Sequence, residues 1–189
     1  MNTFHLRLCA LLGLLVSGLS HAGCSWPNPD PYCLATRLAD RGQYDKALPI
    51  WEELSKHGDC DADWQLGLAT FMGYGVPMDS KKALIYWNSA AARDQPRADI
   101  ALADVYFRNP NTWIVCSAEC GGLLPDPVVA YRWYLVAERN ARIKWDKDYL
   151  ARAMPHVREV LTADQRAAAE KDAAQWQPAL PDCKPRNAP

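Results

Sequence analysis

Apolar residues in the central part of the chain recur at the three- and four-residue steps of an α-helix. Between residues 61 and 72 they include Ala62, Leu66 and Ala69. A second stripe between residues 80 and 93 comprises Ala83, Tyr86, Trp87, Ala90 and Ala91. This spacing is typical of helices with one buried face. We therefore expect one helix over 61–72 and another over 80–93.

The segment that joins these two helices has the composition of a turn. Gly73 and Gly75 tolerate the positive φ that is common after a helix end, and Pro77 prevents the helix from continuing. Asp79 stands where an N-cap acceptor belongs. A phosphate-binding loop would need a strand before the glycines and a lysine or a dinucleotide-binding pattern after them. The segment is therefore interpreted as the turn of a helix hairpin.

The same pattern repeats along the chain. Ala47, Leu48 and Trp51 are followed 36 residues later by Ala83, Leu84 and Trp87, and Ala62, Leu66 and Phe71 by Ala98, Leu102 and Phe107. From Ala83 to Ala130 the step is 47 residues, so the third unit carries 11 extra residues in a cysteine-containing loop, 108–126. Repeated helix pairs of this length stack because one pair cannot bury its apolar face alone. Trp51, Trp87 and Trp133 are expected to fill the core between the pairs.

The central unit resembles a Sel-1-like repeat, a branch of the tetratricopeptide-like helical repeats. The matching positions are Ala62, Leu66-Gly67, Gly73, Gly75-Val76, Asp79, Lys82-Ala83, Tyr86-Trp87 and Ala90-Ala91. Thr70 and Asp94 depart from the pattern, which usually has Tyr and a terminal Gly there. The resemblance extends more loosely over residues 34–176. It implies an all-α fold, an α/α solenoid of about three helix-hairpin repeats with a C-terminal capping helix.

The segments that flank the repeats predict an exported protein. Residues 1–22 have one early positive charge at Arg7, an apolar stretch over 8–16 and small residues at Ser20 and Ala22, the pattern of a signal peptide. We expect cleavage after Ala22 and a periplasmic or secreted location, with no integral membrane segment after the signal is removed. A lipid anchor at Cys24 is the minority alternative.

The remaining chain is divided by composition and by the repeat pattern. We expect an N-terminal cysteine-containing segment (23–33), repeats at 34–60, 61–95 and 96–141, which together span 34–141, C-terminal helices (142–178) and a tail (179–189).

The net charge and the cysteines indicate which ligands and cross-links to expect. The formal net charge of −1 gives no basic face for nucleic acid. An even number of cysteines behind a signal peptide predicts disulfides. The candidates are Cys24, Cys33, Cys60, Cys116, Cys120 and Cys183. Cys116 with Cys120 is the best single guess because they share a loop. No Cys-x-x-Cys exists and His57 and His156 are isolated, so neither a metal nor another cofactor is expected.

The resemblance places the first helix of each pair on the concave face of the solenoid. The predicted binding residues are Asp61, Trp64, Leu68, Phe71, Met72, Arg97, Ile100, Asp104, Phe107 and Arg108, with Tyr32, Thr36 and Asp40 as further candidates in the first unit. Five of them would form an exposed apolar stripe: Trp64, Leu68, Phe71, Ile100 and Phe107. Such a stripe is typical of a binding surface. The alternative is that the N-terminal segment or the cysteine loop covers it.

These observations favour a non-enzymatic periplasmic adaptor or scaffold that binds a protein partner on the concave face. One alternative is an immunity or inhibitor protein against a secreted effector. Another is an enzyme or binder acting on peptidoglycan fragments, since some cysteine-rich members of the resembled family have been discussed as β-lactamase-like. The chain lacks Ser-x-x-Lys and His-Glu-x-x-His motifs, and no catalytic residues are expected.

Overall fold

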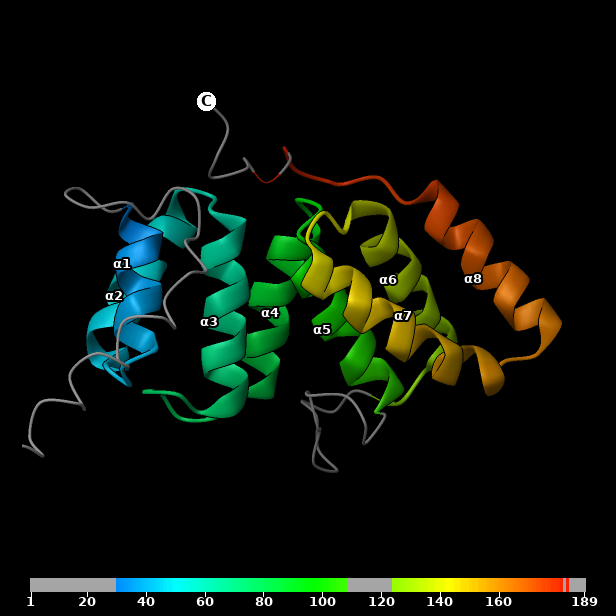
Figure 1. Cartoon of the computed structure of the whole chain (residues 1–189), viewed down its shortest axis with the longest axis horizontal. Coiled ribbons are helices and arrows are strands. Elements are labelled where there is room, and N and C mark those ends of the chain that lie inside the picture. Colours follow the sequence, from blue (N-terminus) through cyan, green and yellow to red (C-terminus); the bar gives the residue numbers. More distant parts are fainter. Residues whose placement is uncertain (1–29, 109–123, 182, 184–189) are drawn as a thin grey trace, which may run out of the picture.

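The computed structural model describes residues 30–108, 124–181 and 183, and these residues form α-helices without any strand (Figure 1). The helices are α1 (Pro31–Ala39), α2 (Tyr44–Lys56), α3 (Cys60–Met72), α4 (Ser80–Ala91), α5 (Pro96–Phe107), α6 (Pro127–Asn140), α7 (Lys144–Glu159) and α8 (Ala163–Gln175). The predicted all-α class is confirmed. The predicted signal peptide, Cys24 and the predicted pair of Cys116 with Cys120 lie outside the described residues.

The helices form successive hairpins arranged in a row. α1 packs on α2, α3 on α4, and α5 on α6, and each hairpin also packs against the next through α2 with α3 and α4 with α5. α7 packs on α6 and α5, while α8 packs on α6 and closes the row. The result is the predicted helical array with C-terminal helices.

Polar side chains and glycines set the helix ends at the expected places. The Asp79 carboxylate accepts a hydrogen bond from the backbone N–H of Lys82 at 2.9 Å, which caps α4. Gly73 ends α3 with φ of 74°, and Asp94, where the repeat pattern would have Gly, also adopts a positive φ of 55°. Thr162 and Gln165 form a reciprocal capping box at the start of α8. These local features confirm the predicted turn and caps.

Two apolar cores meet at α3. The smaller core joins α1, α2 and α3 through residues such as Trp51 and Leu66, and the larger core extends from α3 to α8. The predicted core positions of Trp51, Trp87 and Trp133 are confirmed, since all three are buried. α3 is therefore covered on two sides and links the first hairpin to the rest of the array.

Within the described parts of the chain, none of the helices combines the length and apolar character that crossing a membrane requires.

Candidate functional site

The first helices of the successive pairs contact one another directly. Gln65 Nε2 on α3 donates a hydrogen bond to the Tyr32 hydroxyl on α1, at 3.1 Å. Gln95 Nε2, at the start of α5, donates to Asp61 Oδ1 on α3, at 3.0 Å. We call the surface of α1, α3, α5 and α7 the first-helix face. The predicted binding residues lie in or at the ends of α1, α3 and α5.

At the centre of this face, Arg97 of α5 joins three helices. Its guanidinium carbon lies 5.1 Å from the ring centroid of Trp64 on α3 and 5.7 Å from that of Trp145 on α7. Its Nε lies 3.3 Å from Asp146 Oδ1 on α7. We call Trp64, Arg97, Trp145 and Asp146 the Arg97 cluster. The two indoles and the carboxylate hold the guanidinium in one orientation by cation–π attraction and a charge-assisted hydrogen bond.

Burial and charge act in opposite directions on Asp146. Burial disfavours the charged carboxylate and raises its pKa, while the nearby Arg97 lowers it, and the burial effect is the larger. The ion pair is therefore mainly a positioning contact whose desolvation offsets much of its attraction.

Trp145 supplies the most accessible apolar surface of the cluster. Its side chain is 47% exposed and stacks on Tyr149 with ring centroids 5.5 Å apart. Trp64 is buried in comparison. An exposed indole held by a neighbouring ring and a guanidinium is a rigid contact element for a partner molecule.

A buried carboxyl group underlies the same region. Asp104 of α5 accepts hydrogen bonds from the hydroxyls of Tyr134 on α6 and Tyr149 on α7, the latter at 2.6 Å. Burial raises the pKa of Asp104 to about 7, although both hydrogen bonds favour the charged form. The pKa of Tyr134 is raised as well, by burial and by the Asp104 charge. This network joins α5, α6 and α7 in the interior.

The expectation of an exposed apolar stripe is wrong for three of its members. Trp64, Phe71 and Ile100 are buried, and Leu68 and Phe107 are half-buried. Phe71 packs against Trp87 of α4 at 5.3 Å between centroids, so it lies between the helices of one hairpin. Ile100 belongs to the larger core.

Asp104 is likewise buried, because α6 and α7 enclose it, and it is not offered at the surface as expected.

The other predicted site residues retain some exposure. Met72 is exposed, and Asp61, Arg97 and Arg108 are half-buried. Asp61 and Arg97 lie in the region that Gln95 and Trp64 connect. Met72 and Arg108 end α3 and α5 and belong to none of the contacts of the Arg97 cluster described above.

Sequence reasoning missed the contribution of α7. Trp145, Asp146 and Tyr149 lie in a segment that was assigned only to C-terminal helices. The four-residue spacing of Trp145 and Tyr149 was a usable signal, because it predicts two aromatic rings on one helix face. Their pairing with Arg97 and Asp104 depends on the position of α7 over α5.

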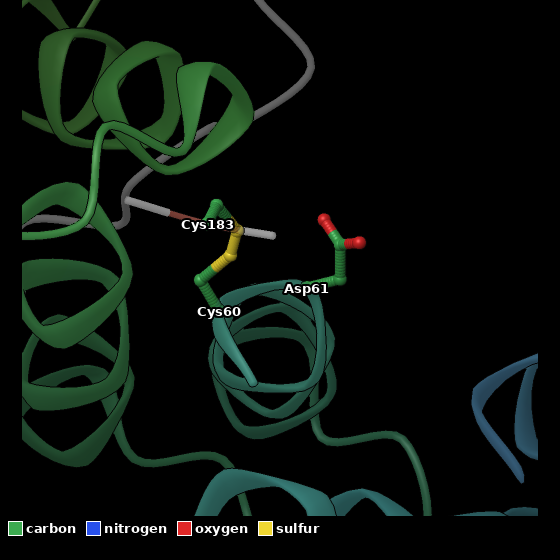
Figure 2. A group of neighbouring side chains, drawn as sticks. All are labelled: Cys60, Asp61 and Cys183. Atoms are coloured by element: carbon green, nitrogen blue, oxygen red, sulfur yellow. A yellow bond between two sulfur atoms is a disulfide. The ribbon is translucent and has the colours of Figure 1, made fainter. Parts of the chain in front are cut away.

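A disulfide bond lies at the edge of the first-helix face. Cys60, at the start of α3, is bonded to Cys183 with Cα atoms 5.8 Å apart, and Asp61 lies beside them (Figure 2). Cys33 is also disulfide-bonded. Cys60, Asp61 and Cys183 bring their ligand atoms within 4.8 Å of one another, as a metal site would. Metal binding by cysteine requires the thiolate, and these two sulfur atoms are bonded to each other, so the donor set does not suit a metal.

The fold is similar to that of a solved protein. The match is to a protective antigen of uropathogenic Escherichia coli that displays an SLR (Sel-1-like repeat) fold, with a TM-score of 0.61 and 24% sequence identity. It covers 77% of this chain and 29% of that protein, so this chain spans less than a third of the length of its neighbour. No family model and no curated protein match the sequence. The described helices of this chain form an SLR fold, as the central repeat led us to expect.

Proposed function

We propose that this protein is a non-enzymatic interaction module that acts in the periplasm or after secretion and holds a protein partner on its first-helix face. The observation that carries the proposal is the Arg97 cluster. It places a half-exposed Trp145 beside a guanidinium that two other helices keep in position.

The residue types of the cluster suit protein recognition. Trp, Tyr and Arg dominate the binding energy of protein interfaces because they bury a large area and also offer polar contacts. Trp145 and Arg97 are held by Tyr149, Trp64 and Asp146 in the free protein. Less side-chain entropy is therefore lost when a partner binds.

Two of the buried acidic groups, Asp104 and Asp63, favour a structural role over a catalytic one. Asp104 is enclosed and accepts two tyrosine hydroxyls. Asp63 is also buried and accepts hydrogen bonds from the hydroxyls of Ser55 and Ser89. Carboxyl groups engaged in this way bridge helices and are not presented to a substrate.

The structural neighbour is described as a protective antigen, and its description names no partner. The export of this chain is proposed from the signal-peptide pattern of residues 1–22. An immunity protein against a secreted effector would use the same face and differ only in what it binds.

The proposal is tested by affinity capture from periplasmic extract with the oxidised protein lacking residues 1–22. The variant Trp145→Ala removes the exposed indole of the first-helix face. Ile85→Ala is the matched control, because Ile85 is an apolar side chain, 69% exposed, on the second helix of a pair. We expect the wild type and Ile85→Ala to retain the same protein, and Trp145→Ala to bind it at least about tenfold more weakly.

Retention of the same proteins by all three forms would show that the first-helix face is not the binding site. If none of the three forms captures a protein, the proposal of a protein partner is wrong, and peptidoglycan fragments are the next ligands to test. Circular dichroism checks that Trp145→Ala retains its helical content.

A further inference from the structure

The segment that follows α8 returns along one edge of the helix array. Figure 1 shows it leaving α8 and passing α6 toward α3 and α4. We call residues 176–181 and 183 the C-terminal segment. It begins at Trp176, whose ring contacts Trp133 edge-on at 5.1 Å and whose carbonyl accepts a hydrogen bond from Arg139 at 3.3 Å.

The far end of this segment connects the turn between α4 and α5 to the start of α3. Leu180 N–H donates to the carbonyl of Ala92 at 3.0 Å, and Cys183 N–H donates to the carbonyl of Arg93 at 3.0 Å. Ala92 and Arg93 form the turn between α4 and α5. The disulfide then joins Cys183 to Cys60 in the first turn of α3, 123 residues earlier in the chain.

Hydrogen bonds connect the start of α3 and the turn before α5 to the Arg97 cluster. Asp61 follows Cys60 and accepts a hydrogen bond from Gln95. The Gln95 side-chain oxygen caps α5 by accepting from the N–H groups of Arg97 at 2.7 Å and Ala98 at 3.0 Å. Gln95 is buried, so this bridge has little freedom to rearrange while α3 and the turn stay in place. A continuous set of contacts thus runs from the disulfide to the backbone of Arg97.

We propose that the C-terminal segment is a redox-sensitive lock on the candidate binding face. In the oxidised protein, the Cys60–Cys183 bond holds the start of α3 against the turn before α5 and so fixes Gln95 and the Arg97 cluster. Reduction leaves the far end of the segment held by two backbone hydrogen bonds, and local opening then costs little free energy. Only the consequence for partner binding rests on the proposed function.

Reduction by thiol–disulfide exchange can begin at Cys183, the more accessible of the two cysteines. Cys60 is buried and Cys183 is half-buried, so the thiolate of a dithiol reductant attacks Cys183 Sγ. The bond to Cys60 breaks, and Cys60 leaves as a thiolate that takes up a proton. The second thiol of the reductant then displaces Cys183, which is released as a thiol. The protein gains two electrons and two protons, and the reductant becomes a disulfide.

Hydrogen exchange with mass spectrometry tests the lock on the protein alone. Wild type is compared with Cys60→Ser/Cys183→Ser, and peptides that cover the amides of Arg97 and Ala98 are followed. We expect these amides to exchange at least about tenfold faster in the double variant, because the Gln95 cap loses its fixed position. A folded double variant with unchanged exchange there would overturn the proposal.

A second pair of variants decides the question if the double variant does not fold. Leu180→Pro removes the N–H that bonds to Ala92 but keeps both cysteines, whereas Leu180→Ala keeps the N–H and removes more of the side chain, so a loss of side-chain contacts alone would affect Leu180→Ala more. With the disulfide reduced by a dithiol, the far end of the segment is held only by its backbone hydrogen bonds, so we expect faster exchange at Arg97 and Ala98 in Leu180→Pro than in Leu180→Ala. Equal exchange in the two variants would mean that the segment does not control the face. Neither experiment uses a partner, so its failure is distinct from a failure of the capture experiment.

Discussion

At the scale of single residues, the close contact between Gly67 and Trp87 explains a feature of the repeat pattern. A Cβ on Gly67 would lie 2.3 Å from Nε1 of the Trp87 indole. Trp87 is fully buried, and its Nε1–H donates to the carbonyl of Trp64 at 3.3 Å. The glycine of the Leu-Gly pair therefore leaves room for the tryptophan of the next helix, and the two positions together set the distance between α3 and α4.

Gly67→Ala is expected to destabilise the protein by about 1–3 kcal/mol, as overpacking of a tight core does. The buried indole cannot move away without losing its hydrogen bond and its contact with Phe71. Urea unfolding followed by circular dichroism measures the change.

The control for this prediction is the same substitution in a Trp87→Phe background, where the smaller ring leaves space for the new methyl group. Gly67→Ala should cost less there. Equal costs in both backgrounds would show that the indole does not exclude a side chain at position 67.

At the scale of elements, α7 is held over α5 by a pair of contacts with different chemistry. Tyr149 donates to the buried Asp104, and Asp146 contacts the half-buried Arg97. Burial raises the pKa of Asp104 to about 7, from 3.8 as the ordinary value. The folded protein therefore keeps the Asp104 proton over a pH range in which the unfolded chain has lost it.

This difference makes stability pH-dependent in a defined direction. Where the unfolded chain binds fewer protons, the free energy of unfolding falls as pH rises. The contribution of Asp104 is fully present below pH 3.8 and is lost as pH rises through about 7. We expect Asp104→Asn, which cannot titrate, to show a smaller fall in Tm between pH 5 and pH 8 than the wild type. The corresponding difference in the loss of unfolding free energy is on the order of a few kcal/mol.

The matched control is Asp148→Asn, because Asp148 is an exposed carboxyl on α7, the helix that supplies Tyr149 to Asp104. It should keep the wild-type slope of Tm against pH. Burial also raises the pKa of Asp63, Asp99 and Asp146, so some slope remains in every variant. An Asp104→Asn slope identical to that of the wild type would contradict the prediction.

At the scale of the whole molecule, the Cys60–Cys183 bond closes a loop that contains most of the array. The disulfide joins Cys60, at the start of α3, to Cys183, which follows α8, so the closed loop includes all the helices of the larger core. The first hairpin lies outside this loop and packs through its own smaller core. Such a long loop restricts the unfolded chain strongly, so the bond is expected to stabilise the folded state.

Reduction of the oxidised protein should lower Tm by roughly 4–15 °C, from about 2–4 kcal/mol per disulfide in a domain of this size. Differential scanning calorimetry with and without a dithiol measures the shift. Cys60→Ser/Cys183→Ser separates the contribution of this bond from that of the disulfide formed by Cys33. An oxidised double variant with the wild-type Tm would show that this bond does not stabilise the fold.

The local pattern of the sequence was sufficient to predict α3, α4 and the helix-hairpin turn between them. Apolar spacing predicted α3 and α4, and Gly73 and Asp79 end and begin them where expected, because these features depend only on neighbouring residues. The repeat also determined the SLR fold, since identical units that bury the same faces stack in the same way.

Only the tertiary structure decided which side chains of the first helices are accessible and which cysteines pair. Trp64 and Asp104 occupy positions that a regular solenoid would expose, yet α7 packs over α5 and supplies the partners of Arg97 and Asp104. Cys60 meets Cys183 because the C-terminal segment returns along the array. Both outcomes depend on where distant parts of the chain come to lie, and residue spacing along the sequence carries no information about that.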